Sequence, residues 1–357
     1  MKIDLEEERL RAVLVQLVEV PGGVLLKRGC AEMNVEGEGA KAIVEFLLGR
    51  AASAPATRQE LADGVPPSMR EAVTDLIDQL RQRRILIAED EPVEEAPEGP
   101  LDVLYWHFGA RAADVVDRLS SRRIAVLGVN SVSRQLLIAL ARGGTPNVTA
   151  VDYPLLRNVS LFDTAGGLSP DDWPAAIAVS PFESWWEQEQ DGLFDCLVAT
   201  SDFGGMHLLR RWNEFCVDRG IHFLPVVLQN LIGYVGPLVV PGETACFECL
   251  RARQNANFDD PEAQRAVEPA AFEGQSVVAF HPSMASILGD LAAMELTKFY
   301  SGVIPTWRVG ALVEVNLLQP SITTRNVLRI PRCSVCSPLK TRSPVSTRID
   351  PFVPVAE

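Results

Sequence analysis

The sequence predicts an α/β protein of two domains. A small winged-helix-like module of three strands and three helices is followed by a doubly wound α/β domain that carries two pairs of cysteines. Three observations predict this: strand patterns precede helical patterns in residues 1–88, a strand-turn-helix-strand unit fills residues 122–153, and CxxC pairs begin at Cys246 and Cys333. With 357 residues, 47% of them hydrophobic, the chain is long enough for two or three domains with real cores.

Charge excludes some classes of partner. The net charge of −14 disfavours nucleic acid and anionic membranes, because both bind basic surfaces. The sequence contains no apolar run of the roughly 18 residues needed for a membrane span, and the acidic start MKIDLEEERL does not resemble a signal peptide. We expect a cytoplasmic protein.

The N-terminal module spans residues 1–88. Strands are expected over Val13–Val20 and in the segments GVLLKRG and AEMNVEG. The first helix is expected from Gly39 to Leu48. The second begins after Thr57, with Glu60 completing a capping box, and the third lies in PPSMREAVTDLIDQLRQRRIL.

The third of these helices carries two stripes of side chains. Met69, Val73, Leu76 and Leu80 form a stripe that faces the core of the module. The adjacent stripe is expected to face a partner and consists of Ile77, Arg81 and Arg84.

The third strand is an edge to which an extended peptide could add as a fourth strand. Its candidate peptide-binding residues are Ala31, Glu32, Met33, Asn34 and Val35. A winged helix with the basic run RQRR also suggests DNA binding. Residues 1–98 nevertheless hold 12 Lys and Arg against 20 Asp and Glu, a net charge of −8 that would repel phosphates.

Residues 89–100, EDEPVEEAPEGP, are acidic and rich in proline, so we expect a linker there. The α/β domain is then expected over residues 101–340, beginning with a helix at Leu101–Ser120. Pro282–Tyr300 should form a long amphipathic helix, buried against the sheet or at a dimer seam. Residues 341–357 are expected to form a flexible tail.

The unit at residues 122–153 has the pattern of a nucleotide-binding βαβ unit, in which glycines after the first strand let phosphates approach a helix N-terminus. Only Gly128 is present here. The following positions carry Asn130, Ser131 and Ser133, whose side chains would crowd a pyrophosphate. We therefore expect a vestigial nucleotide site, comprising Gly128, Asn130 and the acids Asp152 and Asp202 that end two strands.

The cysteine pairs Cys246-Cys249 and Cys333-Cys336 together provide four thiolates, which suit a closed, structural Zn²⁺ site. A redox CxxC normally precedes a helix as a single pair, and two disulfides do not suit the cytosol.

The order of these landmarks resembles two families. The N-terminal module resembles the PqqD-like recognition element of enzymes that modify ribosomally made peptides, which holds the leader peptide of the substrate. The glycine turn, the acid in VDY, the ATSD strand and the CxxC pairs resemble the ThiF/MoeB-type adenylating family over residues 101–340. The chain departs from that family at its ATP site. Pro154 stands where the second acid should be, Phe203 replaces an Asn, and no cysteine lies between the two CxxC pairs.

These resemblances imply a ThiF-like partner protein of thiazole/oxazole-modified peptide biosynthesis. Such a protein binds the leader peptide and docks it to a separate YcaO cyclodehydratase, which supplies the ATP chemistry. We expect a non-catalytic subunit, homodimeric through its ThiF-like domain, that does not bind ATP. The alternative is a ThiF-like enzyme that adenylates a precursor peptide directly.

Overall fold

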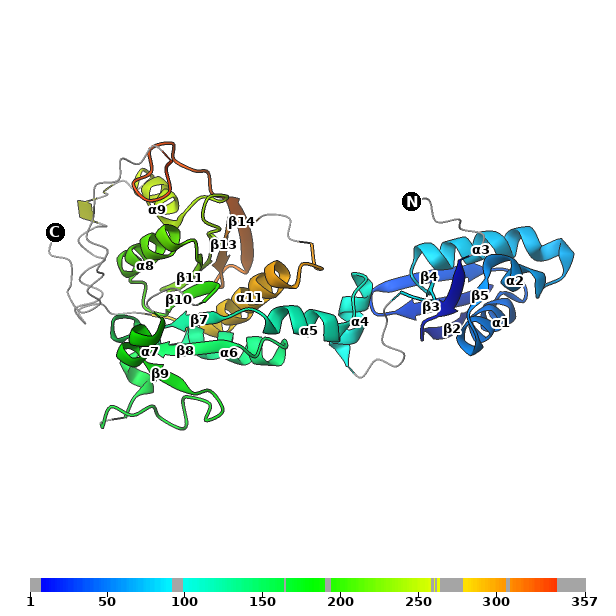
Figure 1. The fold of residues 1–357 in the computed structure, drawn as a ribbon, viewed down its shortest axis with the longest axis horizontal. Coiled ribbons are helices and arrows are strands. Elements are labelled where there is room, and N and C mark those ends of the chain that lie inside the picture. The colour runs from blue at the N-terminus through cyan, green and yellow to red at the C-terminus, as the bar shows by residue number, and fades with distance from the viewer. Residues whose placement is uncertain are drawn as a thin grey trace. The chain divides into compact units, whose positions relative to one another are not determined.

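The computed structural model describes residues 8–91, 99–163, 165–189, 194–257, 260, 262–263, 279–305 and 309–338. The chain divides into two compact units, one of Met1–Arg118 with Ser301–Ile304 and one of Leu119–Tyr300 with Pro305–Glu357. Figure 1 shows their elements. Most of the expected linker, residues 264–278 and the whole expected tail lie outside the described residues.

The first unit contains the expected three-stranded antiparallel sheet, in the order β2-β3-β4. Its strands are β2 (Gln16–Val20), β3 (Gly23–Arg28) and β4 (Ala31–Glu36). The strand expected from Val13 begins later, at Gln16, and the unit also contains a second small sheet that we did not predict. That sheet places β1 (Arg9–Ala12) between β5 (Ala56–Thr57) and β6 (Leu86–Ala88).

The expected helices of this unit are present. They are α1 (Ala40–Ser53), α2 (Arg58–Asp63) and α3 (Arg70–Gln82), the last preceded by a 3-10 turn at Pro67–Met69. The capping box of α2 is confirmed. The Thr57 hydroxyl accepts from the N–H of Glu60, whose carboxylate accepts from the N–H of Thr57.

The core of the first unit joins α1, α2 and α3 to strands of both small sheets. Its most buried side chains include Val24, Leu26, Val44, Leu47, Leu61, Val73, Ile77 and Leu80. The prediction for Ile77 was therefore wrong, because this side chain is only 1% exposed. Helix α3 packs against strands as well as helices, so the buried part of its surface is wider than the single stripe that we predicted and includes Ile77.

The single helix expected from Leu101 to Ser120 is two helices, α4 (Pro100–His107) and α5 (Ala112–Ser120). Gly109 lies between them with φ +80°, a left-handed conformation that ends a helix. Helix α4 belongs to the first unit, where Trp106 packs against Val13 and Ile87. The first unit thus extends beyond the boundary expected at residue 88.

The second unit is built on an eight-stranded mixed sheet, in the order β14-β13-β12-β11-β10-β7-β8-β9. The five strands from β11 to β9 in that order are parallel, and β12, β13 and β14 continue the sheet through antiparallel pairs, each strand antiparallel to its neighbour. The strands are β7 (Ile124–Leu127), β8 (Val148–Asp152), β9 (Val179–Pro181), β10 (Cys196–Ser201), β11 (His222–Gln229), β12 (Ile232–Val235), β13 (Ala311–Asn316) and β14 (Ser321–Asn326).

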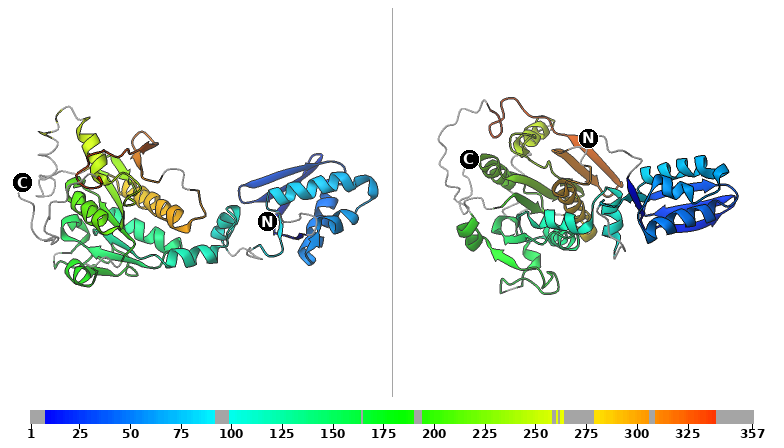
Figure 2. Two further views of the ribbon diagram at one scale, coloured as in Figure 1. Left: turned by 45° about the horizontal axis from the view of Figure 1, so that its top comes forward. Right: turned by 45° about the vertical axis from the view of Figure 1, so that its right-hand side comes forward.

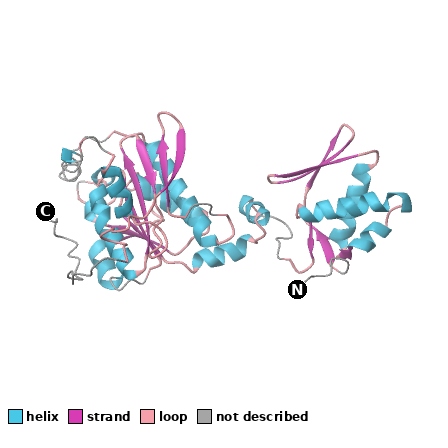
Figure 3. Cartoon of the chain, turned by 90° about the horizontal axis from the view of Figure 1, so that it is seen from above, coloured by secondary structure: helices cyan, strands magenta, loops and turns pink. Residues whose placement is uncertain are grey.

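Helices cover both faces of this sheet, as the views in Figures 2 and 3 show. One face carries α6 (Ser131–Arg142) and α11 (Pro282–Ser301), and the other carries α7 (Phe182–Glu189), α8 (Met206–Arg219) and α9 (Phe247–Asn255). Gly289 lets α11 approach α6 closely, because a Cβ there would lie 2.7 Å from the backbone nitrogen of Leu136. The expected α/β fold is confirmed, with a large mixed sheet between two layers of helices. None of the described helices combines the length and apolar character that a bilayer span requires.

Candidate functional site

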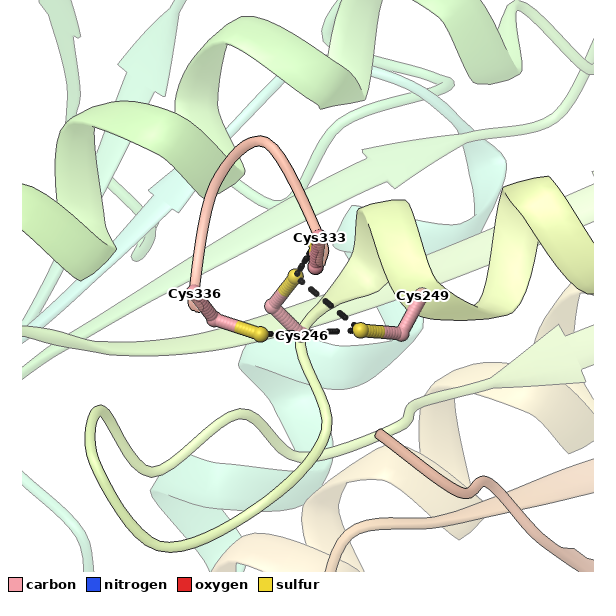
Figure 4. Close-up of side chains that lie close together, drawn as sticks. All are labelled: Cys246, Cys249, Cys333 and Cys336. Atoms are coloured by element: carbon pink, nitrogen blue, oxygen red, sulfur yellow. Dashed lines mark hydrogen bonds between the residues drawn. The ribbon is translucent and has the colours of Figure 1, made fainter. Parts of the chain in front are cut away.

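Four cysteines converge in the second unit. Cys246 is the N-cap of α9 and Cys249 lies in its first turn, whereas Cys333 and Cys336 come from the loop that follows β14. Their sulfur atoms lie 3.8 Å apart for Cys246 and Cys249, 3.6 Å for Cys246 and Cys333, and 3.5 Å for Cys249 and Cys336 (Figure 4). The expected convergence of the two pairs is confirmed, and the first pair opens helix α9.

The spacing of the sulfur atoms fits a tetrahedral metal site. Zinc bound to thiolates at about 2.3 Å gives a tetrahedron with edges of about 3.8 Å. All four sulfur atoms lie within 4.8 Å of one another, and none of the cysteines is in a disulfide. Four thiolates with these separations could hold one Zn²⁺ and leave no position for a reacting water.

The electrostatics of the cluster also favour a cation. Burial, followed by the charges of the neighbouring sulfurs, raises the pKa of Cys246, and burial raises the pKa of Cys249 to about 11. Burial opposes ionisation of Cys333 too, but hydrogen bonds from the N–H groups of Cys336 and Val335 lower its pKa. A divalent cation would offset the cost of gathering several thiolates in this buried place.

Hydrogen bonds beside the cluster hold the two cysteine pairs together. The N–H of Ile330 donates to the sulfur of Cys249 over 3.4 Å. Arg253 of α9 donates to the carbonyl of Leu328, and Arg329 donates to the carbonyl of Thr244. The cluster therefore fixes the end of the described chain against the start of α9.

A second candidate site lies in the turn between β7 and α6. Gly128 has φ +101°, and a Cβ there would lie 2.9 Å from the side-chain nitrogen of Asn130. The space next to this glycine is filled by Asn130, which is completely buried. Its Oδ1 accepts from the N–H groups of Val132 and Ser133 over 3.1 and 3.0 Å.

The amide nitrogen of Asn130 ties the same turn to two neighbouring segments. It donates to the carbonyl oxygens of Leu156 and Thr200 and lies 3.0 Å from the hydroxyl of Thr200. Asn130 is thus both the N-cap of α6 and a structural bridge. Leu156 and Thr200 are distant in sequence, so no local pattern could identify them.

Asp202 also occupies the start of α6. Its carboxylate accepts from the N–H of Ser131 over 3.0 Å and from the side chain of Asn158 over 2.7 Å. The side chain is 1% exposed. The N-terminus of a helix is where a nucleotide phosphate would bind, and here an acid of the chain itself takes that place.

The acid at the end of β8 has a partner as well. Both oxygens of Asp152 accept hydrogen bonds from Arg157, at 2.9 and 2.6 Å. The guanidinium of Arg157 lies 4.5 Å from the centre of the Phe162 ring. The structure brings all four residues of the predicted nucleotide site to one end of the parallel strands and engages three of their side chains internally.

The candidate peptide-binding residues of β4 lie at an edge of the first sheet. The N–H of Gly37, which follows β4, donates to the carbonyl of Gly22, which precedes β3. Every second residue of an antiparallel strand directs its backbone groups to the same side, so the odd-numbered residues of β4 face β3. The backbone groups of Glu32, Asn34 and Glu36 therefore point away from β3, and we call them the β4 edge. In agreement with this assignment, the carbonyl of Glu32 accepts a hydrogen bond from the side chain of Arg83 over 2.6 Å.

The side chains of β4 follow the same alternation. Met33 is buried, and Ala31 and Val35 are partly buried, whereas Glu32 and Asn34 are exposed. The strand thus has an apolar inner face beside its outward backbone groups, of which the carbonyl of Glu32 already accepts from Arg83.

The arginines at the end of α3 are engaged by acids of the chain. Arg81 forms ion pairs with Glu8 at 2.9 Å and Glu91 at 3.1 Å, and Arg84 also pairs with Glu91. We expected Ile77, Arg81 and Arg84 to be left free of the core for a partner. Ile77 is instead buried, and both arginines form ion pairs with acids of the chain. Glu8 and Glu91 flank the module in sequence, and their roles could not be foreseen from helical spacing.

The fold and these sites define a class: an α/β protein with a small N-terminal sheet module, a large mixed sheet and a cysteine cluster able to hold a metal. No protein-family model and no curated protein matches the sequence. Among solved structures, the E. coli protein MccB is similar, with a TM-score of 0.66, 18% identity and coverage of 92% of this chain and 97% of MccB.

The microcin C7 biosynthetic enzyme MccB in complex with N-formylated MccA is similar to the same degree, with a TM-score of 0.66, 18% identity and coverage of 92% and 100%. The heterocyclase TruD is similar with a TM-score of 0.57 and 18% identity, over 92% of this chain and 43% of TruD. At such identities the likeness establishes the fold alone.

Proposed function

We propose that this chain is a non-catalytic subunit that binds the leader of a ribosomally made precursor peptide and docks it to a separate YcaO-type cyclodehydratase. The cyclodehydratase would then close Cys, Ser or Thr residues of the precursor into azolines. The observation that carries the non-catalytic role is the start of α6, where Asn130 and Asp202 already engage the donors that a nucleotide phosphate would need.

The similar structures support peptide handling. MccB is a microcin biosynthetic enzyme that has been solved with N-formylated MccA, and its likeness extends over both units of this chain. TruD is a heterocyclase, and this chain spans 43% of it. We infer that this chain supplies one part of such an activity and that another protein supplies the ATP-dependent part.

The β4 edge is the proposed place for the leader, which would add as an antiparallel strand. The candidate contact residues remain those of β4, from Ala31 to Val35. Arg81 and Arg84 would form ion pairs with an acidic residue of the leader if that residue displaced Glu91, their present partner. Ile77 is buried and is not part of this surface.

Reconstitution tests the proposal. A precursor peptide encoded beside this gene is incubated with ATP and a neighbouring YcaO protein, with and without this chain, and mass spectrometry follows the loss of one water per ring. Ring formation that needs both proteins supports the docking role. Equal ring formation without this chain would contradict it.

The second candidate is an enzyme that adenylates the precursor itself, because MccB has also been solved with ATP. Calorimetry with ATP and an assay for AMP release by this chain alone decide between the two. Micromolar ATP affinity or leader-dependent AMP release would favour the enzyme. The filled start of α6 leads us to expect neither.

A further inference from the structure

The exposed side chains along β4 are not uniform in charge. At one end, the guanidinium of Arg83 reaches the strand and donates to the carbonyl of Glu32. At the other end stand Glu36 and Glu38, both exposed. The β4 edge therefore runs from a cation to a pair of acids.

The acids differ in whether the chain already neutralises them. Glu32 pairs with Lys27 of the adjacent strand β3. Glu36 accepts a hydrogen bond from the side chain of Asn34 over 3.2 Å, and among the described residues no ion pair involves it. A strand added beside β4 would therefore meet one uncompensated carboxylate in its path.

We propose that the β4 edge selects an extended peptide segment by the direction of its charge, which deepens the proposed leader-binding function and rests on it. In antiparallel addition the N-terminal part of the segment lies beside Glu36 and the later part beside Glu32 and Arg83. The preferred segment reads base, apolar, polar, apolar from its N-terminal end. The base faces Glu36.

The two apolar positions follow from the pleat. Successive side chains of a strand alternate between the two faces of a sheet. Met33 and Val35 turn to the inner face, where Met33 belongs to the core and Val35 packs against it. Peptide residues opposite them lie on the same inner face, so that apolar side chains are favoured there.

Glu36 is the specificity-determining residue of this surface. A cross-strand pair of opposite charges is favourable, and like charges directly opposite are destabilising by a similar amount. Reversal of Glu36 should therefore change the affinity of the charge-matched segment by about five- to tenfold.

The experiment uses the full-length protein and two labelled synthetic leaders of the neighbouring precursor peptide. In one leader the position opposite Glu36 is Lys, and in the other it is Glu. Fluorescence anisotropy gives the affinity of each leader for the unaltered protein, for Glu36→Lys and for the control Glu19→Lys. Glu19 is an exposed acid on β2, the opposite edge strand of the same sheet, so the control makes the same change in net charge.

The expected result is an exchange of preference. The unaltered protein and Glu19→Lys should bind the Lys leader about five- to tenfold more tightly than the Glu leader, and Glu36→Lys should reverse that order. Equal effects of the two substitutions would show that only net charge matters and would overturn the inference. Binding that ignores both substitutions would overturn it too, while leaving leader binding intact. If the unaltered protein binds neither leader, the proposed function fails as well.

Discussion

The carboxylate of Asp202, at the end of β10, accepts a hydrogen bond from the backbone N–H of Ser131, at the start of α6, over 3.0 Å. In a nucleotide-binding βαβ unit this N–H would face a phosphate. Here a carboxylate of the chain itself occupies this position, and Asn130 accepts hydrogen bonds from the next two N–H groups. The turn between β7 and α6 is thus held by internal side chains.

Replacement of Asn130 by alanine should destabilise the second unit strongly. It removes the N-cap of α6 and leaves buried carbonyls at Leu156 and Thr200 without this donor. We expect a loss of about 2–4 kcal/mol in the free energy of unfolding, measured in urea. The control Ser131→Ala keeps the backbone N–H that Asp202 uses and should cost far less. Equal effects of the two would contradict the role assigned to Asn130.

The isolated protein should contain about one zinc per chain, because four thiolates at these separations make a closed site. Cys246→Ser or Cys333→Ser should remove the metal and lower the thermal stability, since the binding energy of a structural zinc is also folding energy. Elemental analysis and thermal unfolding measure both effects. Cys30→Ser, which changes an exposed cysteine outside the cluster, should keep the metal. A well-folded protein isolated without zinc would refute this assignment.

The second unit should lose stability as the pH falls below neutral. Burial lowers the pKa of His222, whose Nδ1 lies 2.7 Å from the hydroxyl of Tyr300. The neighbouring charges act in both directions, with Asp195 and Glu243 raising the pKa and Arg122 lowering it. The unfolded chain binds the proton more readily than the native state, so the contribution of His222 is complete above the ordinary histidine pKa and declines below it.

Thermal unfolding between pH 7 and pH 5 measures this effect. The variant His222→Gln cannot titrate in this range and should show a weaker pH dependence. His281→Gln changes an exposed histidine whose ring accepts from the N–H of Ser283, and it serves as the control. A steeper loss of stability in His222→Gln than in the unaltered protein would contradict the sign of the shift.

Proline at position 34 should weaken leader binding, because it removes a donor of the β4 edge. The expected loss is about fivefold, in line with about 1 kcal/mol for one hydrogen bond. Asn34→Ala keeps the N–H and serves as the matched control. Affinity is measured by titration with the labelled leader, and circular dichroism checks the fold of both variants. Full affinity in a folded Asn34→Pro protein would place the leader elsewhere.

The sequence by itself determined what depends on neighbours along the chain. The capping box of Thr57 and Glu60 and the long helix before Tyr300 follow from local hydrogen bonding and from the spacing of apolar residues. The spacing of the two CxxC pairs likewise predicted a four-cysteine cluster, because metal-binding thiolates leave a short and recognisable pattern.

Only the tertiary structure decided how those elements use their side chains. Ile77 is buried because strands and helices surround α3, which helical spacing alone does not reveal. Arg81 meets Glu8 from the start of the chain, and Asn130 meets Thr200 from a strand that is adjacent only in the folded sheet. Such contacts join residues about 70 positions apart, and the chain brings them together only when the hydrophobic cores assemble.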